Sequence, residues 1–499
     1  MDLQFQKTTC QCLDRLAYDV RSVEQTQELR LSDGMPDIGR VLAAWGQPIL
    51  RSKEWRSDSV LLSGGILMWV LYAPEDGTEA RCVDSWLPFQ LKLDLQDNTP
   101  EGSVRIQFLP KLSDARSLSS RKLLLRSGAS VLVQIYVPRQ AEIWTVPENT
   151  EGVELLRSRY PLRIPKEMGE KSFLIDEDLT LPGSAPQPEK LIYYSLRPEI
   201  SDQKVLSDKV VFRGNGNLHV LYRSEEGQLH NWDFPVPFSQ YAPLDSSFSA
   251  DARADVMLCP TSLELELDDE GHMRLKAGIA GQYLVDDRQM VEVLEDAYSP
   301  NRELNLSQEA LELSVVLENR RENLYAEQML PVNMNLAADL LFLPEYPRLY
   351  PGSTGVRMEI PGTFQALYYD ENGALQGSAG RWEGTQELPA DAESQLSAVP
   401  VPSAPPQMAL SEGAVTLKSE LPLQMTALSR QQIPMITGVE FGEQREPDPG
   451  RPSLILRRAE SRGLWDLAKE SGSTMDAIRK ANGLQEDPVP GQMLLIPIA

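Results

Sequence analysis

Three stretches of the chain repeat one pattern and decide its fold: VLLSGGILMWVLYAPEDG (residues 60–77), VVFRGNGNLHVLYRSEEG (210–227) and MEIPGTFQALYYDENG (358–373). In each stretch a Leu-Tyr pair precedes a terminal glycine, and the tyrosine lies five residues before that glycine. The apolar residues alternate in step, with mostly polar residues between them in the second and third copies. Alternation with a period of two is typical of a half-buried strand and not of a helix. We therefore expect three related β-rich units.

Glycine and tryptophan positions predict that each strand belongs to a hairpin. The terminal glycines Gly77, Gly227 and Gly373 each follow an Asp, Glu or Asn, and glycine tolerates the positive φ of a tight turn. Other glycines interrupt the strands, as expected at a bulge or bend: Gly64, Gly214, Gly216 and Gly362. A tryptophan follows each turn: Trp86, Trp232 and Trp382. The simplest expectation for the hairpin Trp and Tyr residues is core or cross-strand packing, and the alternative is that some form an exposed β-edge to which a partner adds.

The length and the proline-rich stretches suggest how the chain is divided. A chain of 499 residues corresponds to roughly three domains of about 150 residues. Proline removes a backbone donor and favours extended chain, so proline-rich stretches are expected to be spacers: 181–189, 398–407 and 442–452. The fold class predicted is mainly β and multidomain, with three related β units and a small final β-α-α-β domain. The predicted domains are 1–180, 181–320, 321–445 with its proline-rich insert, and 446–499.

Composition excludes several classes of protein. The chain has 48 Lys and Arg against 73 Asp and Glu, a net charge of −25. A nucleic-acid or anionic-membrane binder normally needs a basic face, so neither partner is expected. The N-terminus lacks a basic start followed by an apolar stretch, and the longest apolar run (64–73) is about half of a membrane span. We expect no membrane insertion and a cytoplasmic protein.

Cysteine and histidine positions give no sign of a catalytic or metal site. The cysteines have poor metal or redox spacing and are expected to be reduced structural thiols: Cys10, Cys12, Cys82 and Cys259. His219 falls on the polar side of its strand and is expected to be solvated, and His230 and His272 complete no cluster. HExxH, GxSxG and P-loop patterns are absent from the sequence. We predict no enzyme activity, no catalytic residue, no metal and no cofactor.

The last fifty residues follow a different pattern. A short strand at 454–456 precedes a helix that contains Leu464, Leu467 and Ala468 and ends at Gly472. A second helix begins after Ser473 or Thr474, either of which can cap it, and stops at Asn482-Gly483. Its inner face is expected to hold three apolar residues: Met475, Ile478 and Ala481. A last strand covers 493–496, so the order is strand, helix, helix, strand.

The segment 464–497, LWDLAKESGSTMDAIRKANGLQEDPVPGQMLLIP, closely resembles a LysM domain. LysM domains typically bind N-acetylglucosamine-containing glycans in a groove between the loop before the first helix and the loop after the second. This resemblance implies a partner- or glycan-binding site made of Ser461, Arg462, Gly463, Leu464, Trp465, Asn482, Gly483 and Leu484. The first loop departs from the family's Gly-Asp-Thr. A purely structural interpretation, in which Leu464, Trp465 and Ile478 only fill a small core, stays open.

The upstream repeats resemble the SPOCS domain of endospore-forming bacteria. The elements that match are MPDIGRVL (35–42), the glycine-containing strands that end in VLY, PFSQYAPLD (237–245) and EDAYSP (295–300). Several SPOCS units before a terminal LysM domain resemble spore-coat assembly proteins. That resemblance implies a non-enzymatic scaffold at the forespore surface, in the mother-cell cytoplasm, whose LysM domain docks the coat-base morphogenetic ATPase.

The charge is distributed unevenly between the terminal domain and the β units. Residues 446–499 carry 7 Lys and Arg against 8 Asp and Glu, so the β units carry nearly all of the negative charge. This contrast would leave the terminal domain free to dock on a charged partner, and the alternative is that it only reflects a soluble surface.

Two other functions stay open. One is a cell-wall protein that binds peptidoglycan, with the LysM groove binding N-acetylglucosamine. The other is a wall hydrolase that uses some of the abundant carboxylates.

Overall fold

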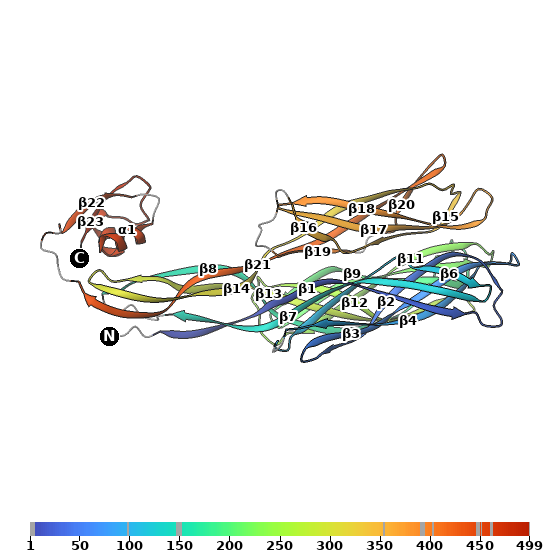
Figure 1. Cartoon of the computed structure of the whole chain (residues 1–499), viewed down its shortest axis with the longest axis horizontal. Helices are drawn as coiled ribbons and strands as arrows, with labels where there is room; N and C mark the ends of the chain where they lie inside the picture. Colours follow the sequence, from blue (N-terminus) through green and yellow to red (C-terminus); the bar gives the residue numbers. More distant parts are fainter. Residues whose placement is uncertain are drawn as a thin grey trace.

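The computed structural model describes residues 5–96, 99–145, 152–352, 355–389, 395–401, 404–445, 450, 452–459 and 463–498. The protein is mainly β and multidomain, as predicted, and the helices in these residues are two short ones near the C-terminus. Figure 1 shows an elongated body of long strands, with the helical module beside one end of it.

The first unit is built from two antiparallel sheets. One sheet is a pair of hairpins in the order β2-β3-β4, and the other has the order β1-β7-β5, with β6 also on β7. Their strands are β1 (Gln6–Arg30), β2 (Ile38–Trp55), β3 (Ser59–Pro74), β4 (Arg81–Asp94), β5 (Ser103–Pro110), β6 (Asp114–Ser119) and β7 (Lys122–Thr145). The long strands β1 and β7, at the two ends of the unit's sequence, pair along almost their whole length.

The second unit repeats this plan. Its sheets have the orders β11-β10-β9 and β12-β13-β8. The strands are β8 (Glu154–Leu179), β9 (Pro188–Leu206), β10 (Lys209–Ser224), β11 (Leu229–Pro243), β12 (Arg253–Leu267) and β13 (Met273–Tyr298). Again the first and last strands, β8 and β13, form one long antiparallel ribbon.

The third unit follows the same plan with extra short strands. Its sheets have the orders β15-β17-β16, with β18 also on β17, and β14-β21-β19, with β20 also on β21. The strands are β14 (Arg302–Leu330), β15 (Leu336–Pro344), β16 (Arg348–Pro351), β17 (Val356–Tyr369), β18 (Leu375–Leu388), β19 (Gln395–Pro400), β20 (Gln407–Ser411) and β21 (Ala414–Gln444). The ribbon here is β14 with β21.

The repeated sequence stretches are the central strands β3, β10 and β17 of the three hairpin sheets. The turn glycines Gly77, Gly227 and Gly373 have φ of 72°, 83° and 74°, which confirms the predicted turns. Within the strands, a Cβ at Gly64 or Gly214 would collide with a backbone carbonyl oxygen of the neighbouring strand. A phenylalanine of the next strand pairs with each of these two glycines. The glycines are therefore required by the close approach of backbone and ring.

Strand pairing groups the residues differently from the predicted domain boundaries. β8 pairs with β13 of unit two, and the whole of β14 pairs with β21 of unit three. The predicted boundaries placed β8 in unit one and divided β14 at residue 320. As limits of independently folding domains, those boundaries stay a prediction. The expected spacer at 398–407 is wrong in part, because Ala398–Pro400 completes β19 on the edge of its sheet, where proline is tolerated.

The three ribbons pack against one another around a shared apolar core, which we call the ribbon core. In Figure 1 the ribbon strands run side by side toward the helical module. The ribbon core consists of Cys10, Cys12, Ala141, Ile143, Leu162, Ile164, Val291, Val293, Leu311, Leu313, Val315, Ile433 and Met435. All four cysteines are free thiols, as predicted, and burial raises the pKa of Cys12 to about 11. Cys10 and Cys12 thus serve as small apolar residues between ribbons.

The three hairpin sheets share a second apolar core, the hairpin core. It consists of Leu42, Ala43, Trp45, Trp69, Leu71, Ile192, Tyr193, Leu221, Leu229, Ala338, Leu341 and Leu367. Trp45 of unit one stacks on Tyr193 of unit two, with ring centroids 4.9 Å apart. Each unit therefore buries both faces of its central strand, one inside the unit and one against its neighbours.

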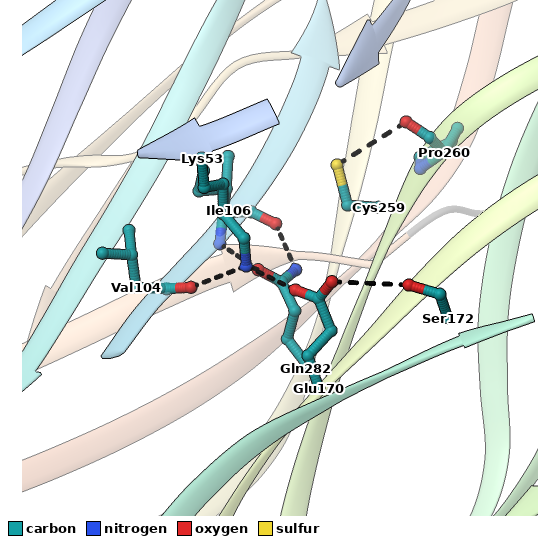
Figure 2. Close-up of polar contacts among 8 residues, drawn as sticks. All are labelled: Lys53, Val104, Ile106, Glu170, Ser172, Cys259, Pro260 and Gln282. Atoms are coloured by element: carbon teal, nitrogen blue, oxygen red, sulfur yellow. Dashed lines mark hydrogen bonds and ion pairs between the residues drawn. The ribbon is translucent and has the colours of Figure 1, made fainter. Parts of the chain in front are cut away.

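Polar residues buried between units one and two find partners across the interface (Figure 2). Gln282 of β13 is 1% exposed, and its amide pairs with the backbone of Ile106 through two hydrogen bonds of 2.8 Å. Lys53 donates to the Gln282 side-chain oxygen at 3.0 Å and to the Val104 carbonyl at 2.9 Å, and it forms an ion pair with Glu170. Because buried polar groups must be hydrogen-bonded, these contacts fix how the two units meet.

His219 is buried, so the expectation of a solvated side chain is wrong. It is 1% exposed and lies between Asp233 of its own unit, 2.8 Å from Nδ1, and Asp339 of unit three, 3.0 Å from Nε2. Burial alone would lower the pKa of His219, but the two carboxylates outweigh it and raise the pKa to about 9. The polar face of β10 is covered by a neighbouring unit, which a local pattern cannot reveal.

The charged His219 predicts a loss of stability at alkaline pH. Because the folded pKa of about 9 exceeds the ordinary value of 6.5, the stabilisation is complete below pH 6.5 and is lost as pH rises through 9. The shift corresponds to about 3 kcal/mol in the free energy of unfolding. Urea unfolding midpoints at pH 6 and pH 9.5 measure this effect. A His219→Gln control should show a smaller pH dependence, and equal dependence in both proteins would contradict the assignment.

Candidate partner-binding module and its attachment

The C-terminal module has the predicted order of strand, helix, helix, strand. Its elements are β22 (Leu454–Arg458), α1 (Leu464–Ser471), α2 (Met475–Asn482) and β23 (Met493–Pro497). Gly472 and Gly483 end the helices with φ of 58° and 60°. The Thr474 hydroxyl accepts a hydrogen bond from the Ala477 N–H at 3.0 Å, so threonine and not Ser473 caps α2. Local sequence signals therefore predicted the order of the elements and the helix ends, but Ala481, which was expected on the inner face of α2, is exposed.

The core of the module contains a residue from outside it. The buried side chains are Ala459, Leu464, Trp465, Ala468, Ile478, Leu494 and Ile496, together with Tyr298 from the end of β13. The Tyr298 and Trp465 rings meet edge to face, with centroids 4.8 Å apart. The Tyr298 hydroxyl donates to the Ser473 carbonyl at 2.9 Å, and burial raises the pKa of Tyr298. Unit two thus completes the core of the module.

A single carboxylate of unit two holds α1. The Trp465 indole N–H donates to Asp296 at 2.8 Å, and the Lys469 ammonium donates to the same oxygen at 2.6 Å. We call Asp296, Tyr298, Trp465 and Lys469 the clasp. Asp296 and Tyr298 both belong to EDAYSP (295–300), one of the elements in which the sequence resembles the SPOCS domain. One physical role of this motif is therefore to attach the terminal module to the β body.

The predicted site residues that the structure describes fall into three groups: residues of the module core, exposed residues, and Asn482, whose side chain is hydrogen-bonded within the module. Leu464, Trp465 and Leu484 contribute to the module core, and Trp465 is 8% exposed. Gly463 and Gly483 are exposed at the start of α1 and the end of α2. Two of the predicted residues, Ser461 and Arg462, lie outside the described residues. A role in partner or glycan binding stays a prediction for all of the predicted site residues.

Asn482 has a structural task in the module. Its amide N–H donates to the Leu495 carbonyl at 2.6 Å, and its oxygen accepts from the Leu495 N–H at 2.8 Å. A further bond runs from the amide to the Ile478 carbonyl at 2.8 Å. The side chain therefore seals one edge of β23, which leaves its amide little capacity for an additional ligand.

Sequence reasoning missed three of the four clasp residues as site residues: Asp296, Tyr298 and Lys469. The motif that contains the first two was recognised, but nothing in a local pattern links it to a helix about 170 residues further along the chain. The usable signal in the sequence was the presence of Tyr298 in the motif and of Trp465 in the first helix. When such a ring is buried, its phenol O–H or indole N–H needs a hydrogen-bond partner.

In the part of the chain that the structure describes, no three or more His, Cys, Asp or Glu side chains cluster in a way that suits a metal ion. Neither helix in those residues has the length or the apolar character that is needed to traverse a bilayer.

Two family models match separate parts of the chain. Residues 187–266, which cover the whole hairpin sheet of unit two and β12 up to its penultimate residue, match the family model described as SipL, SPOCS domain. Residues 464–497 match the LysM domain model. No curated protein and no solved structure matches the chain.

The chain therefore contains a SPOCS domain and a C-terminal LysM domain, as its sequence suggested. The two matches together indicate a sporulation-related protein with a module of the peptidoglycan-binding kind. Both families are non-catalytic.

The clasp predicts a measurable opening of α1 when its carboxylate is removed. Asp296→Ala leaves the Trp465 N–H and the Lys469 ammonium without their acceptor, a loss that typically costs about 1–3 kcal/mol. We expect hydrogen exchange of the α1 amides in the full chain to speed up by at least about tenfold. The control Asp466→Ala, on the exposed side of the same helix, should change these rates by less than about threefold. Equal effects of both substitutions would contradict the clasp.

Proposed function

We propose that this protein is a non-enzymatic scaffold in assembly of the spore envelope, or coat. It works in the mother-cell cytoplasm at the forespore surface. Its LysM domain docks the coat-base morphogenetic ATPase, and its β units offer further surfaces for other coat components. The SPOCS and LysM matches support the link to sporulation.

The clasp is the observation that carries this proposal. Trp465 and Lys469 are committed to Asp296, and Tyr298 completes the core of the module. The LysM domain is therefore held in a fixed position on the β units, and the indole ring of Trp465 is covered by protein. An aromatic ring that is buried in this way is poorly placed to stack on a sugar, whereas a domain in a fixed position suits docking between proteins.

The body itself also suits a scaffold. Three units share the ribbon core and the hairpin core, so their outer surfaces keep a constant spacing. Several weak contacts on one rigid body reinforce one another, since each contact after the first is effectively intramolecular. The net charge of −25 keeps such a body soluble.

Peptidoglycan binding is the second candidate function, and the LysM match favours it. Gly463 and Gly483, which flank the groove implied by the family, are exposed. In this alternative the β units act as spacers, and N-acetylglucosamine is the ligand of the groove.

Parallel binding assays on the full chain separate the two functions. We expect the purified coat-base ATPase to be retained by the immobilised protein, and purified peptidoglycan to sediment little of it. Ile478→Asp should abolish retention, because a charge at this fully buried position unfolds the LysM core. The control Met290→Asp, at an exposed position of β13, should retain the ATPase. Sedimentation with peptidoglycan without ATPase retention would reverse the order of the two candidates.

A further inference from the structure

One face of the LysM sheet is apolar and uncovered. In the antiparallel pair of β22 and β23, Leu456 lies opposite Leu495, and Arg458 lies opposite Met493. The alternate residues Ile455, Leu494 and Ile496 face the helices and contribute to the module core. The other face exposes Leu454 (49%), Leu456 (59%), Met493 (52%) and Leu495 (39%). We call these four residues the LysM apolar face. So many exposed apolar side chains on a two-stranded sheet mark an interaction surface.

The two edges of this sheet differ. The Asn482 side chain is hydrogen-bonded to the N–H and C=O of Leu495 that point away from β22, so the β23 edge is closed to another strand at this residue. Just beyond the two ends of β22, the Ala459 N–H donates to the Gln492 carbonyl (2.7 Å) and the Ile498 N–H donates to the Ser453 carbonyl (3.0 Å). Ser453 and Ala459 therefore direct their backbone groups toward β23. Bonding alternates along an antiparallel pair, so the backbone groups of Leu454, Leu456 and Arg458 point outward. Within 452–459 and 463–498 no hydrogen bond reaches these groups. The β22 edge is therefore open for another strand.

The chemistry of this surface selects a protein strand as its occupant. The LysM apolar face contains aliphatic and methionine side chains but no aromatic ring, so it offers a sugar nothing to stack on. Two arginines stand in the edge strand of a chain that is otherwise strongly acidic: Arg457 forms an ion pair with Glu470 of α1 at 3.5 Å, and Arg458 lies opposite Met493. Arg458 donates to the Gly491 carbonyl at 3.1 Å and remains exposed. An acidic partner segment complements the charge of Arg458, whereas a second copy of this chain would bring the same arginine.

We propose that a β-strand of the partner protein adds to the open edge of β22. Its main chain pairs with Leu454, Leu456 and Arg458, its apolar side chains extend the LysM apolar face, and an acidic residue lies beside Arg458. Main-chain pairing of this kind gives affinity, and alternate side chains give specificity. The inference rests on the proposed function and assigns its docking surface to the sheet, away from the groove between the helix loops.

Leu456→Pro in the full chain tests the main-chain pairing. Proline removes the outward N–H of Leu456, but the inward bonds of Ile455 and Arg457 remain, and proline is tolerated on an edge strand. We expect affinity for the ATPase to fall by at least about thirtyfold. Glu486→Pro is the matched control, since it places a proline in the exposed loop after α2, away from both strands, and its affinity should change by less than about threefold. Unchanged α1 amide spectra confirm that each variant is folded.

A second variant and a second probe keep the outcome decisive. Leu456→Thr with Leu495→Thr removes the apolar cross-strand pair, keeps strand propensity, and decides the question if Leu456→Pro unfolds the module. The second probe is a synthetic peptide of alternating valine and threonine with glutamates at both ends. Loss of both ligands in the Leu456 variants supports strand addition.

The remaining outcomes separate this inference from the proposed function. ATPase binding that survives the Leu456 variants overturns strand addition and leaves the scaffold function standing. Peptide binding that depends on Leu456, in a protein that does not bind the ATPase, overturns the proposed partner and keeps the surface. Failure to bind either ligand overturns both.

Discussion

The packing of the repeated Leu-Tyr pair is the constraint on which the rest of the structure depends. The three tyrosines, Tyr72, Tyr222 and Tyr368, are buried in the cores of their own units, whereas the leucines before them, Leu71, Leu221 and Leu367, meet in the hairpin core. Adjacent residues on a strand point to opposite faces, so each central strand must be covered on both sides. A single unit would leave its leucine face in water. The repeat therefore encodes both the fold of each unit and the association of all three.

This arrangement explains the buried polar groups. Once a neighbouring unit covers the outer face of a sheet, any polar side chain on that face must find a partner in the neighbouring unit. Gln282 finds the backbone of Ile106, and His219 finds Asp339. Such contacts stabilise only one relative placement of the units, because a shifted interface would leave a buried charge or amide without its partner.

The same reasoning separates what the sequence predicts from what it cannot. Turns at Gly77 and Gly227, the helix stop at Gly483 and the strand periods are local, and local chemistry predicts them. The partner of β8 and the burial of His219 depend on strands or units far along the chain, so no window of sequence contains them. Asn482 is instructive, since the family resemblance suggested a binding residue while the amide seals a strand edge. The structural role of Asn482 depends on a strand 13 residues away, which the local pattern does not show, and a binding role for this residue stays a prediction.

One strand, β13, links the β units to the LysM domain. β13 begins in the core of unit two, contributes Val291 and Val293 to the ribbon core, and ends with Asp296 and Tyr298 in the clasp. The position of the LysM domain is therefore set by the register of β13 within the ribbons, because a shift of one residue would turn the clasp side chains to the opposite face. A module held in this way can present the LysM apolar face in a fixed direction relative to the three units. That geometry suits a protein that positions its partners, since a flexibly tethered sugar-binding module would need no such attachment.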